Sequence, residues 1–376
     1  MTWSEYHSLS EQLASQAETV ARRGALQEAV DLYRQAAQAE LTALEAIAPE
    51  RPKTLGVTAV SAVALWYKAG DYASAERIAH KYLGVDLPQF AVQHLRDLLQ
   101  VIWTADAAAR AGIRFVPGDV LVSVKGGQVV YGGAPLHLIV RKVEEVQAVF
   151  YRTAEMLLGA PLRRRGPPTL EIQSVFTPWL FQAPAGSYQF AVRVQEPIQT
   201  DLFPNARPQM EQVASKFMAI VRASATDPET SLPEIVPDPD YRVAFLKLAR
   251  NLAPTGKAFE QLDIRDASVP ASRPISLATG SRDGINAALR KERPVTPREV
   301  KGTLRSLHGI LRAVHLDRDW IELALLEPPQ GEHVTVHDAG DALDDVIGPM
   351  VNRPVVVTVE VGPRGRYSFR DIESDE

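Results

Sequence analysis

The sequence of 376 residues predicts a multidomain α+β protein built from three parts. Residues 1–112 place apolar side chains at helical spacing, interrupted by glycine and proline, and predict an all-α helical array. Residues 113–295 combine alternating β-branched segments with further helical periodicity, which predicts an α+β middle domain. Residues 296–376 hold several short strand-like segments around one helix and predict a small β-barrel-like domain.

The N-terminal part contains five segments in which apolar residues recur every three or four positions. Pro49 and Pro52 separate the second segment from the third, because proline lacks the amide N–H and clashes with the preceding turn. Gly112 stops the fifth segment. The predicted helices are Thr2–Arg23, Leu26–Ala48, Thr54–Ala69, Tyr72–Leu83 and Pro88–Ala111.

The stretch Trp66–Pro88 carries the pattern of a helical hairpin. Gly70 can take the left-handed conformation that closes a helix, and Asp71 can cap the helix that follows. Ala75 is small at a position where two helices must approach closely. This stretch resembles the second half of a tetratricopeptide (TPR) repeat.

Ala21–Ala37 shows the same pattern, with Gly24 at the turn and Ala29 at the close contact. Gly24 and Gly70 lie 46 residues apart, whereas the family repeats at about 34 residues, so we expect a decorated TPR-like array. The resemblance implies a protein-interaction scaffold that binds a protein partner. The residues expected to bind that partner are Tyr33, Trp66, Tyr67 and Tyr72. The alternative is a helical bundle that only packs on the rest of the chain, because two units fall short of the three that stacking needs.

The composition excludes several classes of protein. A net charge of −5 argues against polyanion binding by the whole chain, and the lack of cysteine excludes disulfides, thiolate catalysis and cysteine-ligated zinc. No apolar run reaches the length of about 18–20 residues that spans a membrane. The polar, acidic start does not resemble a secretory signal, so we expect a cytoplasmic protein without a membrane partner. Residue usage associates the chain with a bacterium.

The middle part mixes both periodicities. The Gly126-Gly127 pair between alternating β-branched residues predicts a hairpin within Phe115–Tyr131, and the four prolines and five acidic residues of Asp227–Asp240 predict an exposed loop. The predicted helices are Leu136–Leu158, a short one in Leu170–Phe181 interrupted at Pro178, Pro208–Ala225, Tyr241–Leu252 and Arg282–Lys291, and the predicted strands are Tyr188–Val194, Ala258–Ile264 and Pro274–Ala278.

The C-terminal part reads as strands, then a helix, then a hairpin around the Gly362–Gly365 turn. This order of elements resembles a small oligonucleotide/oligosaccharide-binding (OB) barrel, and a different small β-barrel is an equal alternative. The predicted strands are Glu299–Leu307, Ile310–Leu316, Trp320–Leu326, Glu332–Val336, Pro354–Val361 and Arg366–Ile372, and the helix is Asp341–Val351.

Two stretches carry an unbalanced charge. Residues 110–165 hold nine Lys/Arg against four Asp/Glu and end in Arg163-Arg164-Arg165, whose guanidinium groups suit phosphate. Arg141 and Lys142 join them as candidate nucleic-acid-binding residues, and the alternative is a solvated turn. Residues 300–376 hold eight Lys/Arg against fourteen Asp/Glu, which opposes phosphate binding by the barrel. We expect Trp320 and Phe369 to be core residues.

Chemical motifs give no defined reaction. His333, His337, Asp338 and Asp341 could seat a divalent metal, but Asp341 is better explained as a helix N-cap, so we expect neither a metal nor a cofactor. The sequence lacks G-x-S-x-G, a phosphate-binding P-loop and H-E-x-x-H. We therefore expect a non-enzymatic adaptor or regulatory subunit, associated with a bacterial multi-protein system of the defence type. The second hypothesis is a nucleic-acid-binding protein that uses Arg163–Arg165, and the third is an unrecognised enzyme.

Overall fold

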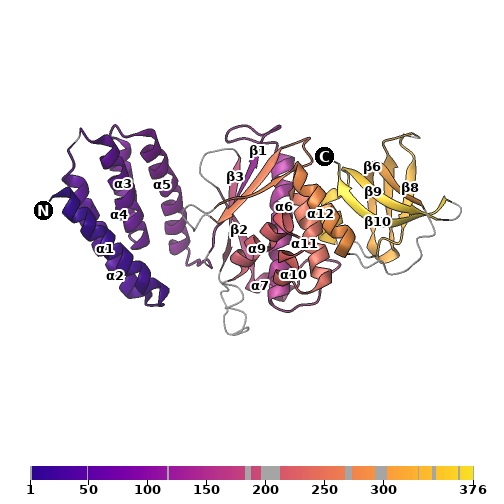
Figure 1. Cartoon of the computed structure of the whole chain (residues 1–376), viewed down its shortest axis with the longest axis horizontal. Coiled ribbons are helices and arrows are strands. Elements are labelled where there is room, and N and C mark those ends of the chain that lie inside the picture. The colour runs from indigo at the N-terminus through magenta and orange to yellow at the C-terminus, as the bar shows by residue number, and fades with distance from the viewer. Residues whose placement is uncertain are drawn as a thin grey trace. The chain divides into compact units, whose positions relative to one another are not determined.

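The structure is a computed structural model that describes residues 2–48, 50–116, 118–182, 188–195, 212–266, 273–292, 303–328, 330–340, 344–362 and 365–375. The chain divides into two compact units, Met1–Arg114 and Phe115–Glu376. The predicted fold class is confirmed: helices come first, followed by a mixed region with one sheet and by five strands that close into a barrel (Figure 1). The three-domain division stays a prediction, and its boundary at 295/296 lies outside the described residues.

Five helices form the first unit, and each packs against the next helix of the chain. Alanine dominates the contacts: Ala36, Ala59, Ala75 and Ala79 are completely buried. Their small side chains let the helix backbones approach closely, which explains how an alanine-rich sequence builds a core. The helices are α1 (Trp3–Arg22), α2 (Leu26–Glu45), α3 (Pro52–Lys68), α4 (Tyr72–Leu83) and α5 (Gln89–Arg110).

The predicted turns of this array are confirmed. Gly24 and Gly70 have φ angles of 85° and 71°, the left-handed region that a residue without Cβ enters at little cost. The Asp71 carboxylate accepts a hydrogen bond from the backbone N–H of Ser74 at 2.9 Å and so caps α4. Ala29 and Ala75 are buried, as their contact positions require.

The α+β part, residues 115–292, is built on a five-stranded sheet in the order β2-β3-β1-β4-β5. All neighbouring strands are antiparallel. Figure 1 shows α6, α9, α11 and α12 on one side of this sheet. The strands are β1 (Val120–Lys125), β2 (Thr177–Gln182), β3 (Gln189–Gln195), β4 (Gln261–Asp266) and β5 (Ile275–Ala278); the helices are α6 (Leu136–Leu157), α7 (Leu170–Val175), α9 (Val213–Thr226), α10 (Ser231–Ile235), α11 (Pro239–Leu252) and α12 (Thr279–Glu292).

Three predicted elements of this part are wrong. After Gly126-Gly127 the chain does not return as a strand, because a tight turn follows instead. The segment Leu170–Phe181 is helical only to Val175 and then becomes β2, where Pro178 is tolerated because β2 is an edge strand. The segment predicted as a loop, Asp227–Asp240, contains the short helix α10.

The unit Phe115–Glu376 contains a second part, residues 303–375. It is a closed five-stranded barrel with the strand order β10-β8-β7-β6-β9. Neighbouring strands are antiparallel except β8 and β10, which run parallel. Its elements are β6 (Thr303–His315), the 3₁₀ turn η1 (Leu316–Arg318), β7 (Trp320–Leu325), β8 (His333–His337), α13 (Asp344–Ile347), η2 (Gly348–Met350), β9 (Pro354–Val361) and β10 (Tyr367–Ser374).

Within the described residues, the two strands predicted at Glu299–Leu307 and Ile310–Leu316 form a single strand, β6, which begins at Thr303; residues 299–302 lie outside the described residues. Gly309, which suggested a break, is instead a point of close approach, because a Cβ there would lie 2.8 Å from the carbonyl oxygen of Ala324. The strand pairs with β9 from Thr303 to Ile310 and with β7 from Gly309 to His315, with a register shift between Leu311 and Ala313 in the second pairing. The long first strand therefore closes the barrel.

Candidate functional site

The aromatic residues predicted to bind a partner lie at different depths in the helical unit. Trp66 is only 8% exposed and belongs to the core, so its indole is not available as a contact surface. Tyr33, Tyr67 and Tyr72 are half-buried and pack against that core. They come from α2, the end of α3 and the start of α4, so the turn between α3 and α4 presents two of them.

These tyrosines make two separate contacts. The Lys68 ammonium lies 5.2 Å from the centre of the Tyr33 ring and 3.2 Å from a carboxylate oxygen of Glu18. The rings of Tyr67 and Tyr72 are 5.9 Å apart. We call Tyr33, Tyr67, Lys68 and Tyr72 the aromatic patch. It combines apolar ring surface with polar tips, the composition that protein interfaces favour.

Arg141 and Lys142 do not lie on a surface, which corrects their selection as phosphate-binding residues. They are 6% and 2% exposed on the inward side of α6. The Lys142 ammonium donates to Glu145 and to the backbone carbonyl of Asn251, both at 2.6 Å. Burial lowers the pKa of Lys142 to about 8, although the charge of Glu145 opposes this shift.

The three consecutive arginines are all bound to carboxylates. Arg163 lies 2.7 Å from Glu155 and 3.6 Å from Asp345, and its side chain is only 14% exposed. The other two are more exposed: Arg164 lies 3.8 Å from Asp240, and Arg165 lies 2.5 Å from Asp317. The structure therefore does not display this run as an open cationic surface.

A row of ion pairs joins the α+β part to the barrel. In each pair the cation belongs to residues 115–292 and the carboxylate to residues 303–375. We call this row the seam. Its pairs are Arg152–Asp345 at 2.7 Å, Arg163–Asp345 at 3.6 Å, Arg165–Asp317 at 2.5 Å, Arg250–Asp371 at 2.6 Å, Arg282–Glu373 at 2.9 Å and Lys257–Asp375 at 2.9 Å.

The centre of the seam is buried. The Arg152 side chain is completely enclosed and donates to both carboxylate oxygens of Asp345, at 2.7 and 2.9 Å. It also donates to Glu155 at 3.2 Å. Burial alone would lower the pKa of Arg152, but the hydrogen bond and charge of Asp345, together with the charge of Glu155, raise it. This bidentate geometry fixes the barrel in one orientation on α6.

The seam explains both charge imbalances of the sequence. The described barrel residues include twelve Asp/Glu and six Arg. Six of those carboxylates face the α+β part: Asp317, Asp344, Asp345, Asp371, Glu373 and Asp375. Apart from these six, the described barrel residues hold six carboxylates and six arginines. The sequence contained this signal, since a basic stretch and an acidic stretch can neutralise each other.

The outer face of the barrel carries a row of side chains across four strands. Backbone pairing places Ser368 beside His337, His337 beside Trp320, and Trp320 beside His315. Trp320 is half-buried on this face and lies outside the core, which corrects its prediction as a core residue, whereas Phe369 is buried as expected. The rings of Trp320 and His315 are 5.6 Å apart. We call these four residues the outer row.

The histidines near this row have other roles than metal binding. His315 Nδ1 accepts a hydrogen bond from the backbone N–H of Arg318, and His333 Nδ1 lies 2.5 Å from Glu322. Asp338 accepts a hydrogen bond from Ser368 at 2.6 Å. Among the described residues, no group of three or more His, Asp or Glu could hold a metal ion, and Asp341, predicted as an N-cap, lies outside them.

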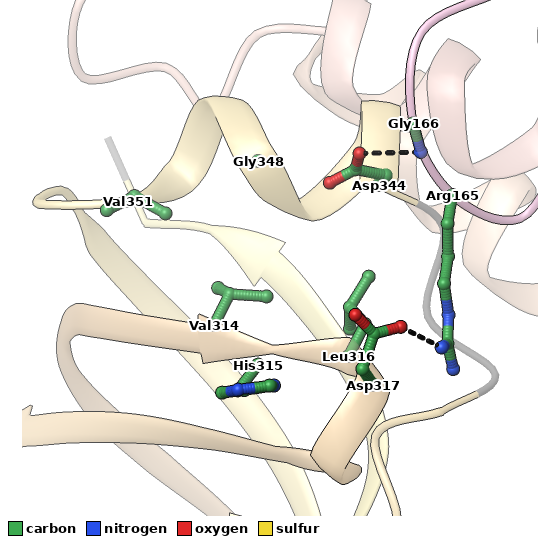
Figure 2. A pocket seen from close by; sticks show the side chains of 9 residues that line it. All are labelled: Arg165, Gly166, Val314, His315, Leu316, Asp317, Asp344, Gly348 and Val351. Carbon is green, nitrogen blue, oxygen red and sulfur yellow. Dashed lines mark hydrogen bonds and ion pairs between the residues drawn. The ribbon is translucent and has the colours of Figure 1, made fainter.

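A hollow of about 460 Å³ opens where the loop that carries Arg163–Arg165, here called the arginine loop, meets the barrel (Figure 2). Val314, Leu316 and Val351 give it an apolar lining. Its charged groups are already paired, because Arg165 binds Asp317 and the backbone N–H of Gly166 donates to Asp344 at 3.1 Å. The hollow therefore offers an apolar floor with a rim of hydrogen-bonded polar groups.

Comparisons of the chain with family models, with curated proteins and with solved structures found no match. None of the described helices combines the length and the hydropathy that crossing a bilayer requires.

Proposed function

We propose that this protein is a non-enzymatic adaptor whose helical unit binds a protein partner. The observation that carries the proposal is the aromatic patch, where Tyr33, Tyr67 and Tyr72 lie half-buried on a core of tightly packed alanines. A rigid array that presents partly exposed aromatic rings suits a partner surface, because such rings give much contact area at little cost in side-chain entropy. The TPR-like turns at Gly24 and Gly70 support the same role.

The proposal is tested by recovering the tagged full-length chain from its native cells, with nuclease treatment and at low and high salt. We expect one protein to be recovered stoichiometrically, and to be lost from the Tyr67→Ala/Tyr72→Ala variant. Leu26→Ser is the matched control, because Leu26 is 68% exposed in the same unit but lies outside the patch. Recovery that is equal in the patch variant and the control would contradict the proposal.

The outer row favours a second candidate function, the binding of single-stranded nucleic acid by the barrel. If the barrel strands β6 to β10 are numbered one to five along the chain, hydrogen-bonded neighbours follow one another around the barrel in the order one, two, three, five, four. This order supports the predicted likeness to an OB barrel. Trp320 gives a ring on which a base can stack, and the balanced charge of this surface removes the objection raised by the acidic sequence. Arg163–Arg165 have no part in this proposal.

Fluorescence anisotropy with single-stranded DNA and RNA, at about 50 and 200 mM salt, tests this second function. We expect Trp320→Ala to weaken binding by about tenfold or more, since stacking of one base contributes about 1–3 kcal/mol. Trp103→Ala is the control, because Trp103 is 45% exposed in the helical unit. The absence of binding by the wild-type chain at low salt would refute this candidate.

A further inference from the structure

The turn between β1 and α6, residues 126–136, is an apolar projection on the surface. Its sequence, G-G-Q-V-V-Y-G-G-A-P-L, contains no charged residue. Val130, Tyr131 and Leu136 are 67%, 73% and 78% exposed. We call these three side chains the knob. Large apolar side chains that gather on one exposed and uncharged segment mark an interaction site more often than an ordinary surface.

The knob is held rigidly. Val130 and Gly133 exchange two backbone hydrogen bonds, of 2.9 and 3.1 Å, and Gly132 supplies the positive φ that this tight turn needs. At its base the backbone N–H of Gln128 donates to the carbonyl of Ala258 at 2.9 Å. A partner therefore does not have to order this segment, and preorganisation of this kind strengthens binding.

The hollow beside the arginine loop is complementary to the knob. The knob has no charged side chain, and the charged groups around the hollow already have partners: Arg165 binds Asp317, and Asp344 accepts a hydrogen bond from the backbone N–H of Gly166. The apolar lining of the hollow suits a tyrosine ring. Asp317, whose side chain is 79% exposed at the rim, can accept a hydrogen bond from a phenol hydroxyl.

We propose that the knob of one copy of this chain inserts into the hollow of a second copy. The contact is head-to-tail, so an open assembly keeps one free knob on the copy at one end and one free hollow on the copy at the other. Three side chains bury far less than the roughly 1,600 Å² of a standard interface, so we expect a dissociation constant on the order of 100 µM. This self-association is independent of the partner proposed for the helical unit.

A lipid surface fits the knob less well. One apolar loop binds a bilayer weakly unless a second signal such as a basic cluster assists it. The lysine that precedes the turn, Lys125, is already paired with Asp263 at 2.6 Å. The observations therefore favour a protein surface as the occupant.

Sedimentation velocity of the full chain, from low micromolar to about 1 mM, is the test. We expect association that Tyr131→Ser weakens by about 30-fold, the loss typical of a central aromatic contact. The control Leu26→Ser, which removes an equally exposed apolar side chain elsewhere, should associate like wild type. Gly348→Met fills the hollow from within, because a Cβ at Gly348 meets only the Asp344 carboxylate, at 3.7 Å.

Mixing the two variants separates this arrangement from other contacts. Tyr131→Ser retains its hollow and Gly348→Met retains its knob, so each alone should stay monomeric while the mixture forms a 1:1 dimer. A wild-type chain that is monomeric at every concentration overturns the proposal. So does equal weakening by Tyr131→Ser and Leu26→Ser, or binding of the wild type to neutral phosphatidylcholine vesicles without self-association.

Discussion

The buried ion pair between Arg152 and Asp345 gives the sharpest test of the seam. Asp345→Ala removes hydrogen bonds of 2.7 and 2.9 Å from a guanidinium that is completely enclosed. Arg152 and Arg163 then share one carboxylate, Glu155, so one buried positive charge is left uncompensated. Breaking a buried pair in this way costs about 3–5 kcal/mol, and the melting temperature of a domain of this size should fall by about 6–20 °C.

The double variant Arg152→Met/Asp345→Asn separates charge from packing. Its remaining charges, Arg163 and Glu155, still pair at 2.7 Å, so no buried charge is left alone. We expect the double variant to be more stable than Asp345→Ala. Urea unfolding followed by circular dichroism measures both. The control Asp317→Ala breaks an exposed pair and should cost about 0–1 kcal/mol. A loss of stability in Asp345→Ala no larger than in this control would refute the reasoning.

Two further predictions concern other buried charges. His7→Ala should destabilise the helical unit by about 1–3 kcal/mol, because it leaves the completely buried Glu40 carboxyl group without the imidazole that lies 3.0 Å from it. Urea unfolding measures this, with Glu11→Ala at an exposed carboxylate as the control. For Lys142, the folded pKa of about 8 lies below the ordinary 10.5, so between these pH values the unfolded state binds more protons. As the pH increases through this window, the free energy of unfolding of the wild type should therefore rise by up to about 3 kcal/mol relative to that of Lys142→Met. Parallel pH profiles of the two proteins would contradict this prediction.

Local patterns were sufficient to predict most helices and the turns of the first unit. Gly24, Gly70 and Asp71 act within a few residues of themselves, so their roles depend little on the rest of the chain. The order of strands and helix in the last part also predicted a small β-barrel, but with six strands, because Gly309 suggested a break within the single strand β6. These are features that sequence spacing encodes directly.

The candidate sites were harder to predict, because charge alone does not tell where a side chain lies. Arg141 and Lys142 are buried on a helix whose sequence reads as a mixed surface, since α6 packs charged residues inward against their partners. Asp345 lies 193 residues from Arg152, a separation that no local pattern reports. Trp320 lies on the outer face and not in the core, because strand alternation places Ile321 and Leu323 inside the barrel.

The seam can form only late in synthesis of the protein. Arg152 is made 193 residues before the carboxylate that it binds, which at about 5–20 residues per second is a delay of roughly 10–40 s. During this time the arginines of the α+β part lack their barrel carboxylates. The nascent chain is then more cationic than the finished protein, because the acidic barrel is made last.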